Sequence, residues 1–140
     1  MTPELESLGR RAIACKGWRW LPGMLAYHPN WRAGRVSHVG LTAVRVACRY
    51  PSPMGGTAWA VPPLPITGLL PDLSDPATLG CQLALVREAI GCPEAHVYYN
   101  PHRLSSRWVV RWGHEWVQGI RTVDANTEAE ALVAALETAP

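Results

Sequence analysis

The segment LPDLSDPATLGCQLALVREAIG, residues 70–91, carries the clearest local folding signal in this chain. Asp75 has the side chain of a helix N-cap, Pro76 suits the first helical turn, and Gly91 is a typical helix stop. One helical face between these residues is apolar and is expected to face the core: Leu79, Leu83, Val86 and Ile90. The segment therefore predicts a helix over residues 76–90.

Two further helices are indicated near the ends of the chain. Thr2 and Pro3 suit the N-cap and first position of a helix that stops at Gly17. Its apolar face would consist of Leu5, Leu8, Ala12 and Cys15. Thr127 and Glu130 have the spacing of a capping box that opens TEAEALVAALETA. The apolar face there would consist of Ala129, Leu132, Val133 and Leu136.

Most of the other segments alternate between apolar and polar residues, which is typical of strands. The alternation covers residues 17–27 and 35–50, which the turn-rich HPNWRAG joins, and returns later in EAHVYYN, RWVVRW and EWVQGIRTV. Gly113 and His114 suit a two-residue hairpin between the last two strands. Residues 51–71 are uncharged and rich in proline and glycine, so they are predicted to form a long loop that packs over the domain or contributes to a binding surface.

These segments predict a single α+β domain over residues 1–140. A chain of 140 residues is long enough to bury its own core. One antiparallel sheet with helices packed on it would bury every amphipathic segment. The predicted order is α-β-β-(Pro-rich loop)-α-β-β-β-α.

Four of these stretches resemble small phage and prophage proteins of the phage ABA-sandwich type. They are GWRW at 17–20, LPDLSDPAT at 70–78, RWVVRW at 107–112 and TEAEALVAAL at 127–136. The resemblance spans nearly the whole chain. Because such proteins are generally of unknown activity, it implies a fold and an origin in a mobile element, and no particular chemistry.

The composition favours a soluble protein. No apolar run approaches the roughly 20 residues needed to span a bilayer, and MTPELESLGRR lacks the apolar region of a secretory signal. The cysteines contain no Cys-x-x-Cys pair, which favours reduced thiols. They are Cys15, Cys48, Cys81 and Cys92. We therefore expect the protein in the cytoplasm of a bacterial host.

The net charge of +2 is unevenly distributed along the chain. Residues 1–50 carry eight basic and two acidic side chains, whereas residues 72–140 carry five basic and nine acidic ones. The basic half favours an anionic partner or a complementary subunit contact. We expect a homo-oligomer, most simply a dimer, with the uncharged 51–71 segment as an apolar contact. Duplex nucleic acid is not expected, because it would need denser basic clustering.

The catalytic motifs considered are missing from the chain. There is no Gly-rich phosphate loop, G-x-S-x-G elbow or H-E-x-x-H helix. His114 and Glu115 lie at a predicted turn, where a solvated pair is expected rather than a general acid and base. Cys92, His96 and His102 have spacings that zinc ligands could have, but they lie on different elements and need not converge. We expect no metal, no cofactor and no catalysis.

Tryptophans beside arginines are the strongest indication of a binding site. Arginine donates bidentate hydrogen bonds to phosphate and aromatic rings stack on bases, so the combination suits planar anions. We assign Trp18 to the core behind the first helix, and Trp20, which precedes the Pro22-Gly23 kink, to a pocket rim. The alternative is that the tryptophans form the core between sheet and helices. The predicted ligand-binding residues are Arg19, Trp20, Met24, Trp31, Arg45, Arg49 and Trp59.

These observations favour a non-catalytic, phage-encoded anti-defence protein that binds and sequesters a nucleotide-type immune signal. One alternative is a direct inhibitor that docks on a host defence effector, as anti-CRISPR proteins do. Another is a small structural or accessory phage protein. A small enzyme that hydrolyses such a signal is the least favoured, because no pair of polar residues stands out.

Overall fold

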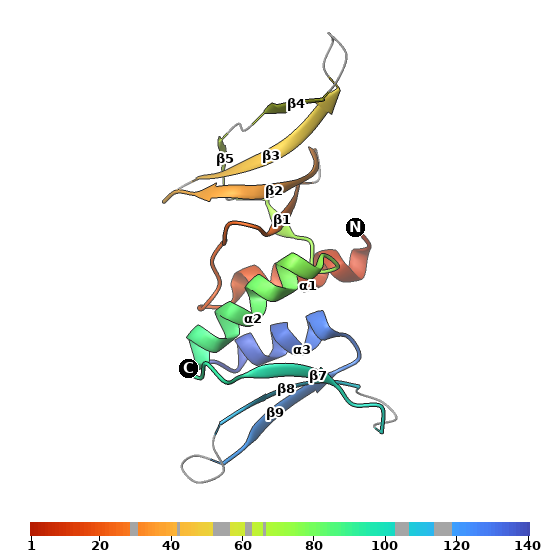
Figure 1. Ribbon diagram of the computed structural model, residues 1–140, viewed down its shortest axis with the longest axis vertical. Coiled ribbons are helices and arrows are strands. Elements are labelled where there is room, and N and C mark those ends of the chain that lie inside the picture. The colour runs from red at the N-terminus through yellow and green to blue at the C-terminus, as the bar shows by residue number, and fades with distance from the viewer. Residues whose placement is uncertain are drawn as a thin grey trace.

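A computed structural model describes residues 1–28, 31–41, 43–51, 57–60, 63–65, 67–102, 107–113 and 119–140. Three layers follow one another along its longest axis, a sheet, a layer of helices and a second sheet (Figure 1). The predicted α+β class is confirmed, with three helices and two antiparallel sheets in the described part of the chain. The second sheet is a correction to the single sheet expected from the sequence.

Helix α2, Pro76–Ile90, has the bounds that its sequence predicts. The Asp75 carboxylate accepts a hydrogen bond from the Thr78 N–H at 2.8 Å, and Gly91 ends the helix at a left-handed φ of 70°. The fully buried residues are Thr78, Gln82, Leu85 and Val86. The other predicted core residues, Leu79, Leu83 and Ile90, are only partly buried. The buried face is therefore rotated, because α2 packs on α3 on one side and meets the first sheet through Thr78.

Helices α1, Pro3–Ala14, and α3, Glu128–Glu137, also begin at their predicted caps. The Thr2 hydroxyl accepts from the Leu5 N–H. The capping box is formed in both directions, by Glu130 N–H to Thr127 Oγ1 at 3.2 Å and Thr127 N–H to Glu130 Oε2 at 3.1 Å. Helix α3 contacts both α1 and α2 and lies between them and the second sheet (Figure 1).

The first sheet has the strand order β4-β3-β2-β1-β6, and β5 also pairs with β3. Its strands are β1 (Leu25–His28), β2 (Trp31–Val39), β3 (Ala43–Pro51), β4 (Thr57–Ala60), β5 (Pro63–Pro65) and β6 (Leu70–Pro71). The predicted 51–71 loop is therefore wrong as one continuous loop, since β4, β5 and β6 lie within it. Proline is compatible with these positions because a strand at a sheet edge does not need every N–H for pairing.

The segment between α1 and β1 also differs from its prediction. The strand begins at Leu25, not at Gly17. Residues 15–24 instead form turns, in which the Trp18 N–H donates to the Cys15 carbonyl at 2.9 Å and Gly23 adopts a φ of 97°. Strand alternation therefore does not govern which way the tryptophans of this segment point.

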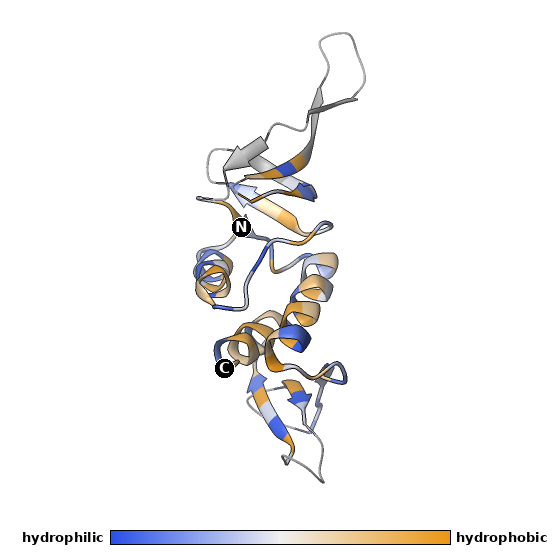
Figure 2. Ribbon diagram, turned by 90° about the vertical axis from the view of Figure 1, so that its left-hand side faces the viewer, coloured by the Kyte–Doolittle hydropathy of each residue, from blue (hydrophilic) through white to orange (hydrophobic). Residues whose placement is uncertain are grey.

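The second sheet contains β7 (His96–Tyr99), β8 (Trp108–Trp112) and β9 (Arg121–Ala125) in that order. Helix α3 contacts all three strands. Two sheets form because the helical layer is apolar on two sides, and each side requires its own cover. Figure 2 shows hydrophobic residues along the helices and on the strands on either side of them.

One buried cluster joins the three layers. Its members include Ala26, Val36, Val44 and Val46 from the first sheet, Leu85, Val86, Leu132 and Leu136 from the helices, and Val110 from the second sheet. A smaller cluster packs α1 on α3 through Leu8, Ala12, Leu73, Ala129 and Val133. In the part of the chain that the structure describes, no helix combines the length and the apolar character needed to cross a membrane.

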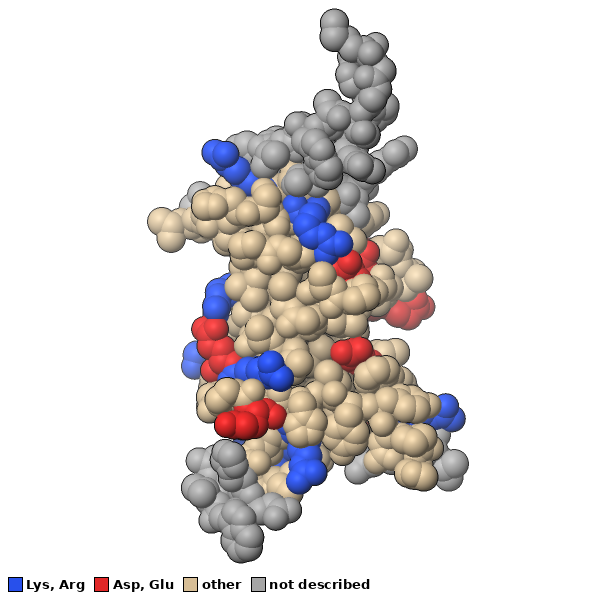
Figure 3. Space-filling view, in the orientation of Figure 1, with Lys and Arg blue, Asp and Glu red and all other residues tan. Residues whose placement is uncertain are grey.

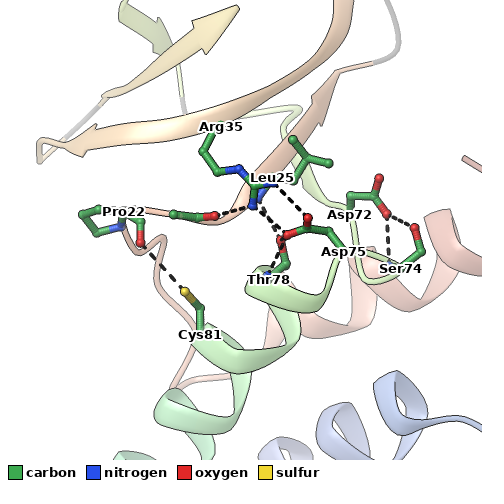
Figure 4. A network of polar contacts seen from close by, with 9 residues as sticks. Pro22, Leu25, Arg35, Asp72, Ser74, Asp75, Thr78 and Cys81 are labelled. Atoms are coloured by element: carbon green, nitrogen blue, oxygen red, sulfur yellow. Dashed lines mark hydrogen bonds and ion pairs between the residues drawn. The ribbon is translucent and has the colours of Figure 1, made fainter.

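Arg35 of β2 ties the first sheet to the start of α2 (Figure 4). Its guanidinium donates to both Asp75 carboxylate oxygens at 2.8 and 2.9 Å and to the Gly23 carbonyl at 2.7 Å. Nearby, the Leu25 N–H donates to Thr78 Oγ1 at 2.8 Å. The hydrogen bond from Arg35, together with those from Thr78, lowers the pKa of Asp75 from 3.8 to about 2.

Candidate functional site: a groove with three basic residues

Residues 15–19 line two adjoining hollows between α1, α2 and α3. The first has a volume of about 490 Å³ and includes Arg11 and Lys16 in its lining. The second has a volume of about 300 Å³ and includes Lys16, Trp18 and Arg19. Because Lys16, Gly17 and Ala89 line both, we treat the two hollows as one site, the basic groove.

The groove exists because residue 17 is a glycine. A Cβ atom at Gly17 would lie 2.8 Å from the Ala89 Cβ and 3.3 Å from Leu136 Cδ1. Any larger residue would have to move the segment away from α2 and α3. Glycine therefore lets the backbone approach both helices and places Lys16 and Trp18 on either side of the contact.

Two bidentate ion pairs flank the groove. Arg11 donates to the Glu137 carboxylate at 2.9 and 2.8 Å, and Arg19 donates to Glu88 at 2.6 Å through both terminal nitrogens. These hydrogen bonds lower the pKa of Glu137 and of Glu88 and raise the pKa of both guanidinium groups. Each guanidinium has five N–H donors, so bidentate pairing leaves some of them available to a further acceptor.

Lys16 lies in the chain between these two arginines and lines both hollows. Its side chain is exposed, and among the described residues it forms no ion pair. Among its side chains the groove consequently has three cations and two carboxylates, and the cation without an ion-pair partner is Lys16. An anion that enters the groove would meet the Lys16 ammonium group there.

The long-range ion pairs connect the basic first half of the sequence with its acidic second half. In the described part of the chain, Arg11–Glu137, Arg19–Glu88 and Arg35–Asp75 each join the basic half to the acidic half. On the face shown in Figure 3, basic and acidic side chains accordingly lie next to one another at several places. Much of the charge difference between the two halves of the sequence is thus neutralised within one chain. The charge difference therefore gives little support to pairing between subunits.

The structure corrects the predicted role of Trp20 and adds a second contact to that of Trp18. Trp20, expected at a pocket rim, is only 4% exposed and belongs to the main core cluster. Trp18, expected in the core, packs against both clusters yet also lines the second hollow. The reason is that residues 15–24 form turns, so the two rings meet edge to face at 5.9 Å instead of pointing the same way from a strand.

The other predicted ligand-binding residues do not form one site around Trp20. Met24 is fully buried in the core, so no ligand reaches it in this structure. Arg19 pairs with Glu88 near the end of α2, whereas Arg45 lies exposed on β3 in the first sheet, which meets the beginning of α2. The two ends of this helix are separated by about 20 Å, at 1.5 Å per residue.

Three further predicted residues, Trp31, Arg49 and Trp59, belong to β2, β3 and β4 by their backbone. Their side chains lie outside what the structure describes, as do His114 and Glu115 entirely.

Sequence reasoning missed Arg11, Lys16 and Gly17 as site residues. The available signal was that Lys16 is the only lysine of the chain and precedes a glycine near a helix end. The two acidic partners lie far along the chain, and no local pattern connects them to this segment.

The described residues include no group of three or more His, Cys, Asp or Glu side chains placed to hold a metal ion. The one thiol in the groove belongs to Cys15, and burial raises its pKa. A raised pKa leaves little of the nucleophilic thiolate at neutral pH. The groove is therefore better suited to binding than to covalent chemistry.

A third hollow of about 560 Å³ lies between the end of α2 and the second sheet. Glu94, Trp112 and Arg121 contribute to its lining. Among the described side chains that line it there is one cation and one carboxylate, so this hollow offers an anion less than the basic groove does.

Comparison of the chain with protein-family models, with curated proteins and with solved structures found no match in any of the three.

Proposed function

We propose that this protein binds a small anionic ligand of nucleotide type in the basic groove and holds it without converting it. The observation that carries the proposal is the position of Lys16, an exposed cation without an ion-pair partner among the described residues, in the lining of both hollows. Phosphate oxygens would bind the ammonium group. The free N–H donors of the flanking arginines would add hydrogen bonds.

The second hollow suits the planar part of such a ligand. Trp18 is partly exposed there, and its ring is held by the edge-to-face contact with the buried Trp20. A ring fixed in this way loses little conformational entropy when a base stacks on it. The charged end and the flat end of a nucleotide would thus be bound by neighbouring residues of one short segment.

The chemistry of the groove supports sequestration over catalysis. The Glu88 and Glu137 carboxylates are held ionised by their arginines, and both have lowered pKa values, which makes them poor proton donors and weak bases. The Cys15 thiol has a raised pKa. A phage-encoded protein that removes a nucleotide-type immune signal from its bacterial host remains our proposal for the biological role.

A second candidate function is direct inhibition of a host defence protein. It is favoured by Leu41, which is fully exposed in the connection between β2 and β3. A protein partner that covers this side chain would remove its apolar surface from water. Leu41→Asp would abolish inhibition of the effector in this case and leave nucleotide binding unchanged.

Calorimetric titration with cyclic and linear nucleotides, and with inorganic phosphate and pyrophosphate, tests the proposal. We expect saturable binding of at least one nucleotide and at least tenfold weaker binding to the Lys16→Gln variant. Arg10→Gln is the matched control, because Arg10 lies on α1, is exposed, and pairs only locally with Glu6. Chromatography of the mixture is expected to recover the ligand unchanged. Absence of heat across the panel, or equal affinity of the Lys16→Gln variant, would contradict the proposal.

A further inference from the structure

Among the described strands, β7 forms one edge of the second sheet, with a row of backbone groups that none of these strands pairs with. In an antiparallel pair, successive residues direct their N–H and C=O alternately toward the neighbouring strand and away from it. The Asn100 N–H donates to the Arg107 carbonyl at 2.6 Å, so the next pair bonded in this way is Tyr98 with Val109. The backbone groups of Val97 and Tyr99 therefore point to the open edge.

Strand β7 itself contains no aspartate, glutamate, lysine or arginine, and the neighbouring cation, Arg107, is occupied as a donor to the Tyr99 hydroxyl at 3.1 Å. Edge strands of soluble proteins often carry charged residues that prevent pairing with another chain. The opposite edge, β9, has exposed Arg121 and Asp124. By contrast, β7 reads HVYY, and its two tyrosines are among the exposed large apolar residues, at 37% for Tyr98 and 46% for Tyr99.

We propose that β7 pairs antiparallel with β7 of a second copy of this chain, so that the two second sheets become one continuous sheet across a two-fold axis. Tyr98 lies opposite the partner's Tyr98, and Val97 lies opposite the partner's Tyr99. This inference does not depend on the basic groove or its ligand. It also places the contact away from the 51–71 segment that the sequence suggests.

Symmetry and hydrogen bonding select this register. A two-fold axis perpendicular to the sheet keeps the helix-covered faces of both copies on the same side. Because opposed residues must then share a face, Tyr98 cannot oppose Val97. Pairing Val97 with the partner's Tyr99 is the register in which the outward N–H and C=O of both residues are bonded in each copy.

The same register covers the exposed rings. Val97 packs against the core and shares a face with Tyr99, so each Tyr99 would contact the Val97 of the other copy. On the opposite face, each Tyr98 would meet its counterpart directly across the axis. Tyr98 already has His96 as a neighbour, with ring centroids 5.7 Å apart, so the axis would be lined by aromatic rings. Cross-strand aromatic and β-branched pairs of this kind stabilise sheets.

Sedimentation velocity, with mass confirmed by light scattering, tests the pairing on the full chain at 1 to about 100 µM, the range in which weak dimers form. We expect twice the 15.3 kDa chain mass at the upper end. Tyr98→Lys places two like charges opposite each other and should weaken the dimer at least tenfold. Thr122→Lys is the matched control, because it adds the same charge to an exposed residue of β9, at the other edge.

Circular dichroism establishes that both variants remain folded, and hydrogen exchange adds a second measurement. The Val97 and Tyr99 amides should be protected at high concentration and lose protection on dilution. A wild-type chain that stays monomeric throughout, or a dimer that Tyr98→Lys and Thr122→Lys affect equally, would overturn the proposal.

Discussion

Replacing Asp75 by asparagine removes the charge that holds the first sheet to α2 while keeping a good N-cap residue. The carboxylate is only 13% exposed, and its pKa falls from 3.8 to about 2, chiefly because Arg35 donates to both oxygens. A lowering of this size corresponds to roughly 2 kcal/mol of stability. Because Arg35 is 43% exposed and solvent screens the pair on that side, the expected loss is about 1–2 kcal/mol.

The pH dependence of the stability loss in Asp75→Asn shows whether the Arg35–Asp75 pair is its cause. A carboxylate with a lowered pKa in the folded state contributes its full stabilisation above its ordinary pKa, and loses it as the pH falls through the folded value. The difference between wild type and Asp75→Asn should therefore be constant above pH 5 and should diminish between pH 3.8 and about 2.

Urea denaturation at several pH values from about 7 down to about 2.5, which passes through the ordinary pKa of Asp75 and approaches its folded-state value, measures this difference in free energy of unfolding. Glu88→Gln is the control, because it breaks a bidentate pair in which both side chains are more than half exposed, and it should change stability little. If the Asp75→Asn deficit were the same at all pH values, the Arg35 pairing would not be its source.

Two further predictions concern the segment between α1 and β1. Trp20→Ala should destabilise the protein by about 3–5 kcal/mol, because Trp20 is only 4% exposed. The thermal midpoint of this variant should lie well below that of Trp18→Ala. Equal midpoints would contradict the different burial of the two rings. Gly17→Ala should lower the free energy of unfolding by about 1–3 kcal/mol in chemical denaturation, because the new methyl group would lie 2.8 Å from the Ala89 Cβ. An unchanged denaturation midpoint would show that the segment moves freely away from α2.

The helices could be predicted from the sequence because their signals are local. The Asp75 cap, the Gly91 stop and the Thr127–Glu130 capping box each depend on residues within one or two turns, and each forms as expected. Strands depend on partners elsewhere in the chain. The alternation around GWRW therefore predicts a strand from Gly17, whereas the strand of the structure begins at Leu25.

The candidate site could be predicted only in part. The neighbouring tryptophans indicate Arg19 as a site residue, but its partner Glu88 lies on α2, and only the folded chain brings the two together. Strand alternation predicts Trp20 at a rim, whereas the turns of residues 15–24 bury it in the core and leave Trp18 partly exposed beside the second hollow.

By itself the sequence determined the α+β class and where the three helices begin, because capping residues act over a few bonds. Tertiary structure alone decided that there are two sheets, which tryptophan is buried, and that basic residues of the first half pair with acidic residues of the second. These features depend on which surfaces meet. A helical layer that is apolar on two sides must be covered on both, and ion pairs form between whichever side chains that packing brings together.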